Sequence, residues 1–155
     1  MKIEEFITLK KLNNRGIIKY NLKADLYHKT IIDSNIPFKP GVYLIYAVKN
    51  NVEKELLYIG KAGHTKDKLN AHPLPARLLA PEQVPVWHKN YSRNTKRFLS
   101  RAKFMPEKVR YFKLDGINIY WFQTYPDLNS NAIEVLLKNE YRKKNNGQLP
   151  IWMNR

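Results

Sequence analysis

The chain has 155 residues, 43% of them apolar, which is enough for one domain with a packed core. It contains no cysteine, and this excludes disulfides, thiolate metal sites and a cysteine nucleophile. Lys and Arg number 28 against 13 Asp and Glu, a formal net charge of +15, and a field of that sign concentrates polyanions. We therefore expect a nucleic acid partner whose affinity falls steeply with salt. The alternatives are a solvated basic surface or an acidic protein partner.

Neither a membrane span nor a secretory signal is expected. No apolar run approaches the roughly 18 residues that a spanning helix requires. The first residues of the chain carry acidic side chains and lack a sustained apolar stretch. Together with the absence of cysteine, these features favour a cytoplasmic protein without membrane association.

The chain is predicted to divide into an N-terminal extension, residues 1–40, and a larger domain, residues 41–155, on which the extension packs. Three apolar residues of the extension would lie on one side of a short helix: Ile3, Phe6 and Ile7. A strand is predicted over residues 16–22.

The domain is predicted to begin with a β-hairpin. Residues 42–48 and 56–60 form two apolar runs, and the polar pair Asn50-Asn51 between them predicts the turn of an antiparallel pair. A short helix is then expected over residues 76–80, which Pro81 ends.

A second, more basic helix is predicted over residues 94–104, stopped by Pro106. Residues 108–114 and 117–124 are predicted as strands that flank Asp115-Gly116, a dipeptide favoured in two-residue hairpin turns.

The last helix is expected to start after Asn129 or Ser130, either of which can cap it, and to end near residues 146–147. Its apolar residues recur at helical spacing: Ile133, Leu136, Leu137 and Tyr141. The fold class that follows is α+β, with a small, mainly antiparallel sheet flanked by about three helices.

Two tripeptides bracket the predicted hairpin, Gly41-Val42-Tyr43 on its first strand and Tyr58-Ile59-Gly60 on its second. Each alone is ordinarily a matter of packing, because a tyrosine suits a half-buried strand. Four residues with polar or charged side chains follow them in order: Lys61, Arg77, Glu134 and Asn154.

This ordered set resembles the GIY-YIG nuclease superfamily over about residues 40–154, with a valine in the middle of the first tripeptide. The form Tyr-Ile-Gly-Lys-Ala is most similar to the type II restriction endonuclease branch and to some phage nucleases. The resemblance implies a GIY-YIG-like fold and a metal-dependent DNA endonuclease, which hydrolyses phosphodiester bonds in double-stranded DNA.

The resemblance makes Glu134 the metal ligand, with one Mg²⁺ or Mn²⁺ ion in each active site. Magnesium prefers oxygen ligands and keeps several waters, so one carboxylate and the substrate phosphate can suffice. The alternative is a solvated carboxylate near a helix N-terminus, where the macrodipole favours a negative charge.

Arg77 is implied to hold a phosphate oxygen and to stabilise the charge of the transition state, which suits a planar guanidinium. Many relatives carry a histidine or tyrosine one turn later, where this chain has Pro81. His72 or His88 could fill this place, but we expect neither to do so, because a lone loop histidine is more often inert than catalytic.

Tyr43 is implied as the general base, with Lys61 close enough to favour its phenolate, because an unperturbed tyrosine is almost fully protonated at neutral pH. Tyr58 would orient the water or the phosphate, and the roles of the two tyrosines are interchangeable at this level. Asn154 would support the site through hydrogen bonds, although Met153 separates it from the preceding aromatic residue.

DNA contacts are expected from a row of basic residues on the predicted helix and just before it. Arg93, Arg97 and Arg101 recur at a spacing of four, which places them on one helix face. Two lysines add charge nearby: Lys96 and Lys103. Trp87, which precedes them, either belongs to the core or wedges between bases.

Three hypotheses follow for function. The first is the nuclease, perhaps a sequence-specific restriction enzyme, for which a palindromic site would favour a homodimer. The second is a non-catalytic nucleic-acid-binding module on a nuclease fold, and the third is an RNA-binding protein that is merely basic.

Overall fold

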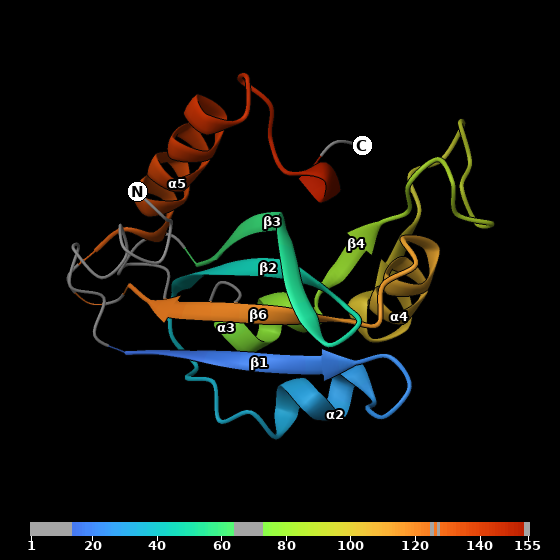
Figure 1. Ribbon diagram of the computed structural model, residues 1–155, viewed down its shortest axis with the longest axis horizontal. Helices are drawn as coiled ribbons and strands as arrows, with labels where there is room; N and C mark the ends of the chain where they lie inside the picture. Colours follow the sequence, from blue (N-terminus) through green and yellow to red (C-terminus); the bar gives the residue numbers. More distant parts are fainter. Residues whose placement is uncertain (1–13, 64–72, 125, 127, 154–155) are drawn as a thin grey trace.

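The computed structural model describes residues 14–63, 73–124, 126 and 128–153. It shows an α+β fold with a four-stranded sheet and a smaller two-stranded sheet, so the expected fold class is confirmed. In this part of the chain, four α-helices and one short 3-10 helix accompany the strands (Figure 1). None of these helices has the length and apolar character needed to cross a membrane.

The main sheet has the order β1-β6-β2-β3, and every neighbouring pair is antiparallel. Its strands are β1 (Arg15–Asn21), β2 (Gly41–Lys49), β3 (Val52–Ala62) and β6 (Gly116–Gln123). Each strand was expected near these bounds. Because β1 pairs with β6 along its whole length, the N-terminal extension supplies one strand of the sheet itself.

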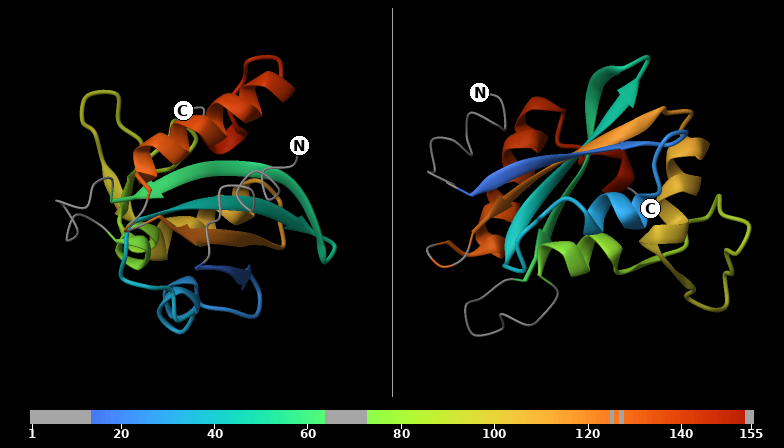
Figure 2. Two further views of the ribbon diagram at one scale, coloured as in Figure 1. Left: turned by 90° about the vertical axis from the view of Figure 1, so that its left-hand side faces the viewer. Right: turned by 90° about the horizontal axis from the view of Figure 1, so that it is seen from below.

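The two faces of the sheet are covered differently (Figure 2). On one face lie α2 (Tyr27–Ile32) and α3 (Leu74–Leu79), and their buried residues share a core cluster with those of α4 (Arg101–Tyr111). On the other face, α5 (Ser130–Lys144) packs on β2 and β3 through a separate cluster. The short 3-10 helix η2 (Ile151–Met153) lies beside β3.

The prediction of a helix over residues 94–104 is wrong. Residues 84–97 form a loop between β4 (Pro81–Gln83) and β5 (Phe98–Ser100), and α4 starts only at Arg101. The Ser100 hydroxyl accepts a hydrogen bond from the Ala102 N–H and caps the helix. Pro106, expected to stop a helix, lies inside α4, where its ring removes one backbone donor without ending the helix.

The strand expected over residues 108–114 and the hairpin at Asp115-Gly116 are also wrong, because α4 runs through Tyr111. Gly116 serves close packing instead: a Cβ there would lie 2.0 Å from the Tyr20 carbonyl oxygen of the paired strand. Asp115 donates its N–H to Val48 at 2.9 Å and so joins this connection to the end of β2.

The helices expected over residues 76–80 and after Asn129 are confirmed as α3 and α5. The Asn129 side chain accepts from the Ala132 N–H at 3.1 Å, so Asn129 is the N-cap. Ile133 and Leu137 are the buried residues of the expected apolar stripe, whereas Leu136 is 42% exposed. The short helix expected around Phe6 lies outside the described residues.

Candidate active site

The β2–β3 hairpin places the two tripeptides side by side. Asn50 and Asn51 adopt φ values of 54° and 60° in the turn, a conformation that asparagine tolerates well. In the resulting register Tyr43 lies opposite Gly60, and Ile45 lies opposite Tyr58. Residues that face each other across an antiparallel pair project from the same face of the sheet, so both tyrosines point toward α3 and α4.

Gly60 allows the first tyrosine to lie across the second strand. A Cβ at this position would be 2.3 Å from Cζ of Tyr43, closer than real side chains pack. The Tyr43 ring therefore lies over the Gly60 backbone, and it stacks on the Tyr58 ring with centroids 5.9 Å apart. All three residues belong to the two tripeptides on which the resemblance rests. Here they pack together as one unit of the hairpin.

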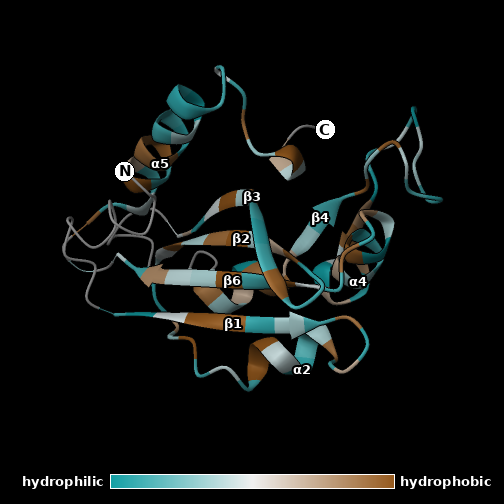
Figure 3. Ribbon diagram, viewed as in Figure 1, coloured by the Kyte–Doolittle hydropathy of each residue, from teal (hydrophilic) through white to brown (hydrophobic). Residues whose placement is uncertain are grey.

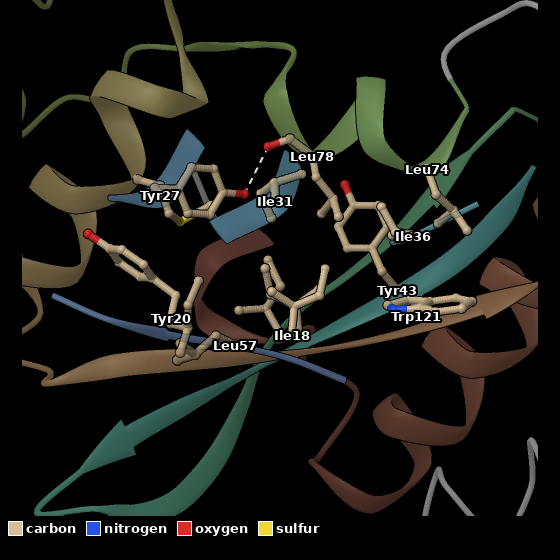
Figure 4. Close-up of a cluster of buried hydrophobic side chains, with 14 of the residues drawn as sticks. Ile18, Tyr20, Tyr27, Ile31, Ile36, Tyr43, Leu57, Leu74, Leu78 and Trp121 are labelled. Carbon is tan, nitrogen blue, oxygen red and sulfur yellow. Dashed lines mark hydrogen bonds between the residues drawn. The ribbon is translucent and has the colours of Figure 1, made fainter. Parts of the chain in front are cut away.

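Tyr43 is buried. Its side chain belongs to the core cluster, and its hydroxyl points toward α3 (Figure 4). The residue is 1% exposed, and within the described part of the chain its hydroxyl has no hydrogen-bond partner. Burial raises the pKa of Tyr43 far above its usual value, and Tyr58 raises it further. Tyr43 is therefore a neutral phenol at physiological pH, which opposes its expected role as general base, whereas Tyr58 is only half-buried.

Lys61 does not lie where its expected role requires. It is opposite Val42, whose side chain belongs to the cluster beneath α5, so Lys61 projects from the other face of the sheet. The expectation that Lys61 favours the phenolate of Tyr43 is wrong, because strand side chains alternate between faces. The cations that lower the pKa of Tyr43 against its burial are Arg101 and Arg77.

Arg101 is the residue that sequence reasoning misplaced most. It is 5% exposed, and its Nη1 donates to the carbonyl oxygens of Arg77 at 2.8 Å and Ala80 at 3.1 Å. These carbonyls end α3, so Arg101 supports the end of the helix that carries Arg77. Arg101 is thus a buried structural cation, and its expected place on a solvent-facing DNA-binding row is wrong.

Glu82 joins two buried cations. Its Oε2 lies 3.4 Å from Nε of Arg101, and its Oε1 accepts from Nζ of Lys108 at 2.9 Å. The Lys108 ammonium also lies 4.6 Å from the ring centroid of Trp152. We call Glu82, Arg101 and Lys108 the buried ionic cluster.

A small cavity separates the buried ionic cluster from the two tyrosines. Its volume is about 10 Å³, roughly the space of one water molecule. Its lining includes polar residues from five elements: Tyr43, Tyr58, Glu82, Arg101, Lys108 and Trp152. The sequence offered no signal for this arrangement, because the spacings between its members follow no helix or strand period.

Two further expected site residues, Lys61 and Glu134, lie on the opposite face of the sheet, where β3 meets α5. Lys61 donates a hydrogen bond from Nζ to the Asn131 side chain, and the Ser130 hydroxyl donates to the Gly63 carbonyl. Glu134 follows Asn131 by three residues and so lies on the same side of α5. Its side chain is 12% exposed, and its Oε1 accepts from Nζ of Lys138 at 3.1 Å.

The expected site residues therefore form two groups. Tyr43, Tyr58 and Arg77 belong to the face covered by α3 and α4, and Lys61 and Glu134 belong to the face covered by α5. Both groups involve β3, which is one of the two edge strands of the described sheet. Asn154 and His72 lie outside the described residues.

The donor set allows for only a sparse metal site. Among the residues that the structure describes, no three His, Asp or Glu side chains cluster in a way that could hold an ion. Glu134 would therefore offer a single carboxylate, of which one oxygen already contacts Lys138. This set fits a magnesium ion only if the substrate phosphate and waters complete its coordination.

Two residues of the β4–β5 loop with ring side chains have structural roles. Trp87 stacks on Tyr111, with ring centroids 4.0 Å apart and an interplanar angle of 9°, so it packs on α4 and is not free to wedge between bases. His88 is 5% exposed, and its Nε2 pairs with the Glu107 carboxylate. This pairing leaves His88 unsuited to replace a catalytic residue near Arg77.

The basic residues expected on one helix are divided between two elements. Arg93, Lys96 and Arg97 are exposed on the β4–β5 loop, and Lys103 is exposed on α4.

Compared with known proteins, the chain matches no family model, and no curated protein or solved structure is similar enough to count as a match.

Proposed function

We propose that the protein is a metal-dependent DNA endonuclease of the GIY-YIG type. The observation that carries this proposal is the register of the β2–β3 hairpin, in which Tyr43 packs across Gly60 and stacks on Tyr58. The positive charge of Arg77, on the next helix, acts on the same tyrosine. These contacts support the part of the expected site that involves the two tripeptides and the arginine, whereas Glu134 belongs to the face of the sheet covered by α5.

In this proposal Tyr58 contacts the substrate, and Tyr43 holds the Tyr58 ring in position. Tyr58 is half-buried, and its ring is held in place by the stack on the buried Tyr43 ring. Arg77 binds a phosphate oxygen, because a guanidinium offers two parallel donors to an oxyanion. Each of these three residues acts from a rigid element, which keeps the cost of ordering the site low.

Glu134 is the residue that would hold Mg²⁺ or Mn²⁺. Such an ion, when bound, supplies charge neutralisation at the phosphate. Two lysines would add positive charge for the DNA backbone near this carboxylate. Lys138 pairs with Glu134 itself, and Lys61 contacts Asn131, three residues earlier in α5.

A second candidate is a nucleic-acid-binding module that does not cleave. The burial of Tyr43 and the raised pKa of its hydroxyl favour this candidate, because they remove one of the two tyrosines from direct chemistry. The ion pair between Lys138 and Glu134 points the same way, because it competes with a metal ion for the carboxylate.

The test is a cleavage assay with two matched variants of α5. Purified protein is incubated with plasmid and with genomic DNA in Mg²⁺, in Mn²⁺ and in EDTA. We expect metal-dependent cleavage that Glu134→Gln reduces by at least about 100-fold, because the only proposed metal ligand is lost. Glu140→Gln is the control, because Glu140 forms a similar pair with Lys143 later in the same helix.

The products separate the narrower alternatives. Discrete fragments indicate a sequence-specific enzyme of the restriction type, and a smear indicates non-specific cleavage. DNA binding without cleavage in either metal would favour the non-catalytic module. Equal cleavage by wild type and Glu134→Gln would contradict the role of Glu134.

A further inference from the structure

The loop between β4 and β5 projects away from the rest of the molecule, beside α4 (Figures 1 and 2). We call this loop, residues 84–97, the basic arm. It carries four exposed cations: Lys89, Arg93, Lys96 and Arg97. The chain has no acidic residue between Glu82 and Glu107, and most of the arm is hydrophilic (Figure 3).

The basic arm is an ordered structure anchored on α4. Trp87 stacks on Tyr111 at 4.0 Å, and it lies parallel to Phe104 at 5.8 Å. His88 pairs with Glu107, and its Nδ1 accepts from the Asn90 N–H at 3.1 Å. At the base of the arm, the Val84 N–H donates to the Arg97 carbonyl at 2.8 Å. A ligand bound by the arm therefore needs to order little additional backbone.

The base of the arm is joined to the helix that carries Arg77. Only Ala80 separates α3 from β4, and β5 ends directly before α4. Arg101 bridges these connections, because its guanidinium contacts the carbonyls of Arg77 and Ala80 as well as the Glu82 carboxylate. The orientation of the arm is thus fixed relative to Arg77 by buried contacts.

We propose that the basic arm grips the phosphate backbone of double-stranded DNA and holds the duplex beside α3. The proposal rests on the proposed function for its substrate, and it adds the element that binds this substrate outside the site. Four cations on one anchored loop neutralise phosphates, and phosphate contacts fix the position of a duplex without reading its sequence.

A duplex fits the arm better than a single strand. Proteins that bind single strands supply aromatic platforms on which successive bases stack. The Trp87 ring is occupied by its stack on Tyr111, and His88 is buried against Glu107. Within the arm, Tyr91 is the exposed aromatic residue, at 38%. The arm therefore offers charge along its length and little stacking surface.

The test compares two triple variants that remove the same charge from different places. The arm variant is Arg93→Ser/Lys96→Ser/Arg97→Ser, and the control is Arg142→Ser/Lys143→Ser/Lys144→Ser in the last turn of α5. Binding to a short DNA duplex is measured by fluorescence anisotropy at several salt concentrations. We expect the arm variant to bind at least about tenfold more weakly and its salt slope to fall by about 2 to 3, roughly 0.9 for each lost phosphate contact.

The control separates the arm from the net charge of the protein. The α5 variant is expected to keep the slope and nearly the affinity of wild type. An unchanged slope in the arm variant, or equal losses in both variants, would overturn the proposal. Tighter binding to a single strand or to an RNA duplex of the same sequence would also overturn it, because the arm would then serve a different ligand.

Cleavage measured in parallel distinguishes the two proposals. Wild-type cleavage that the arm variant retains in full, with unchanged binding, would reject the arm and leave the nuclease standing. Arm-dependent binding without cleavage in either metal would reject the nuclease and leave the arm standing. Circular dichroism of each variant confirms that a loss of binding does not arise from unfolding.

Discussion

The two faces of the main sheet are stabilised by different interactions. Beneath α5 the contacts are largely aliphatic, with Leu44, Ile59 and Leu137 at 0% exposed. The opposite face buries tyrosines and tryptophans together with the buried ionic cluster of Glu82, Arg101 and Lys108. Aliphatic burial needs no partner for each atom, whereas buried polar groups must be paired. The face with the tyrosines therefore depends on specific partners, and single substitutions should damage it more.

The largest expected effect is on the carboxylate of the buried ionic cluster. Glu82→Gln removes the negative charge between Arg101 and Lys108, which are 5% and 6% exposed. Breaking a buried ionic group by removing one partner costs about 3 to 5 kcal/mol, because a charge is left uncompensated. We expect the free energy of unfolding, measured by urea denaturation, to fall by about that amount.

Glu134→Gln is the matched substitution on the other face. This carboxylate pairs with one lysine in the same helix, and such pairs contribute roughly 0.3 to 0.5 kcal/mol. We expect little loss of stability from it, although it should reduce cleavage by at least about 100-fold. Equal losses of unfolding free energy in Glu82→Gln and Glu134→Gln would contradict the claim that the face with the tyrosines depends more on specific partners.

Gly60→Ala should have an intermediate effect. The added methyl group would lie 2.3 Å from Cζ of Tyr43, so the tyrosine ring must move within a packed core. Overpacking of this kind costs about 1 to 3 kcal/mol. Thermal unfolding measures the loss, and Lys61→Ala at the next position of the strand is the control, since Lys61 projects from the other face. A Gly60→Ala protein as stable as wild type would show that the ring has room to move.

Two buried tyrosines on the same face allow a finer comparison. The Tyr27 hydroxyl donates to the Leu78 carbonyl at 2.8 Å (Figure 4), whereas the Tyr43 hydroxyl has no partner among the described residues. Tyr27→Phe should lower the free energy of unfolding by about 1 kcal/mol. Tyr43→Phe should leave it unchanged or raise it by up to about 1 kcal/mol. A larger loss of unfolding free energy in Tyr43→Phe than in Tyr27→Phe would mean that the Tyr43 hydroxyl has a good hydrogen-bond partner.

The smallest expected effect appears at alkaline pH. Burial raises the pKa of Tyr27 and of Tyr43 above the value of an unfolded chain, which is about 10. Above that pH the unfolded tyrosines lose their protons while the folded ones keep them, so stability falls as pH rises. Tyr43→Phe should make this fall shallower between about pH 9 and pH 11, as measured by urea denaturation. Below about pH 9 its pH dependence should match that of wild type, because Tyr43 is then neutral in both states.

Sequence reasoning succeeded where local patterns decide the structure. The strands of the main sheet follow apolar runs, and α5 follows its asparagine cap and the spacing of Ile133 and Leu137. The stretch between Pro81 and Gly116 was mispredicted because its local signals were ambiguous. Pro106 is tolerated inside α4. The glycine at position 116 is needed because β1 packs too close for a side chain, and it does not mark a hairpin turn.

The candidate site was predictable only in part. The hairpin register brings Tyr43, Tyr58 and Gly60 together, as their positions in the two strands suggested. The contacts of Arg101 with Glu82 and with the end of α3 join residues 19 or more positions apart and follow no local periodicity. For the same reason the arginine spacing of four was misread as a helix face, although residues 93–97 form part of a loop.

The edge strand β3 also bears on how copies of this protein behave at high concentration. Within the described residues, β3 pairs with β2 along one edge only. An unpaired edge offers backbone groups to another strand, a common route to aggregation. Glu53, Lys54 and Glu55 are all exposed along the first half of this strand. Charged side chains there discourage edge-to-edge pairing. Two copies brought close together would therefore remain distinct folded units instead of merging their sheets.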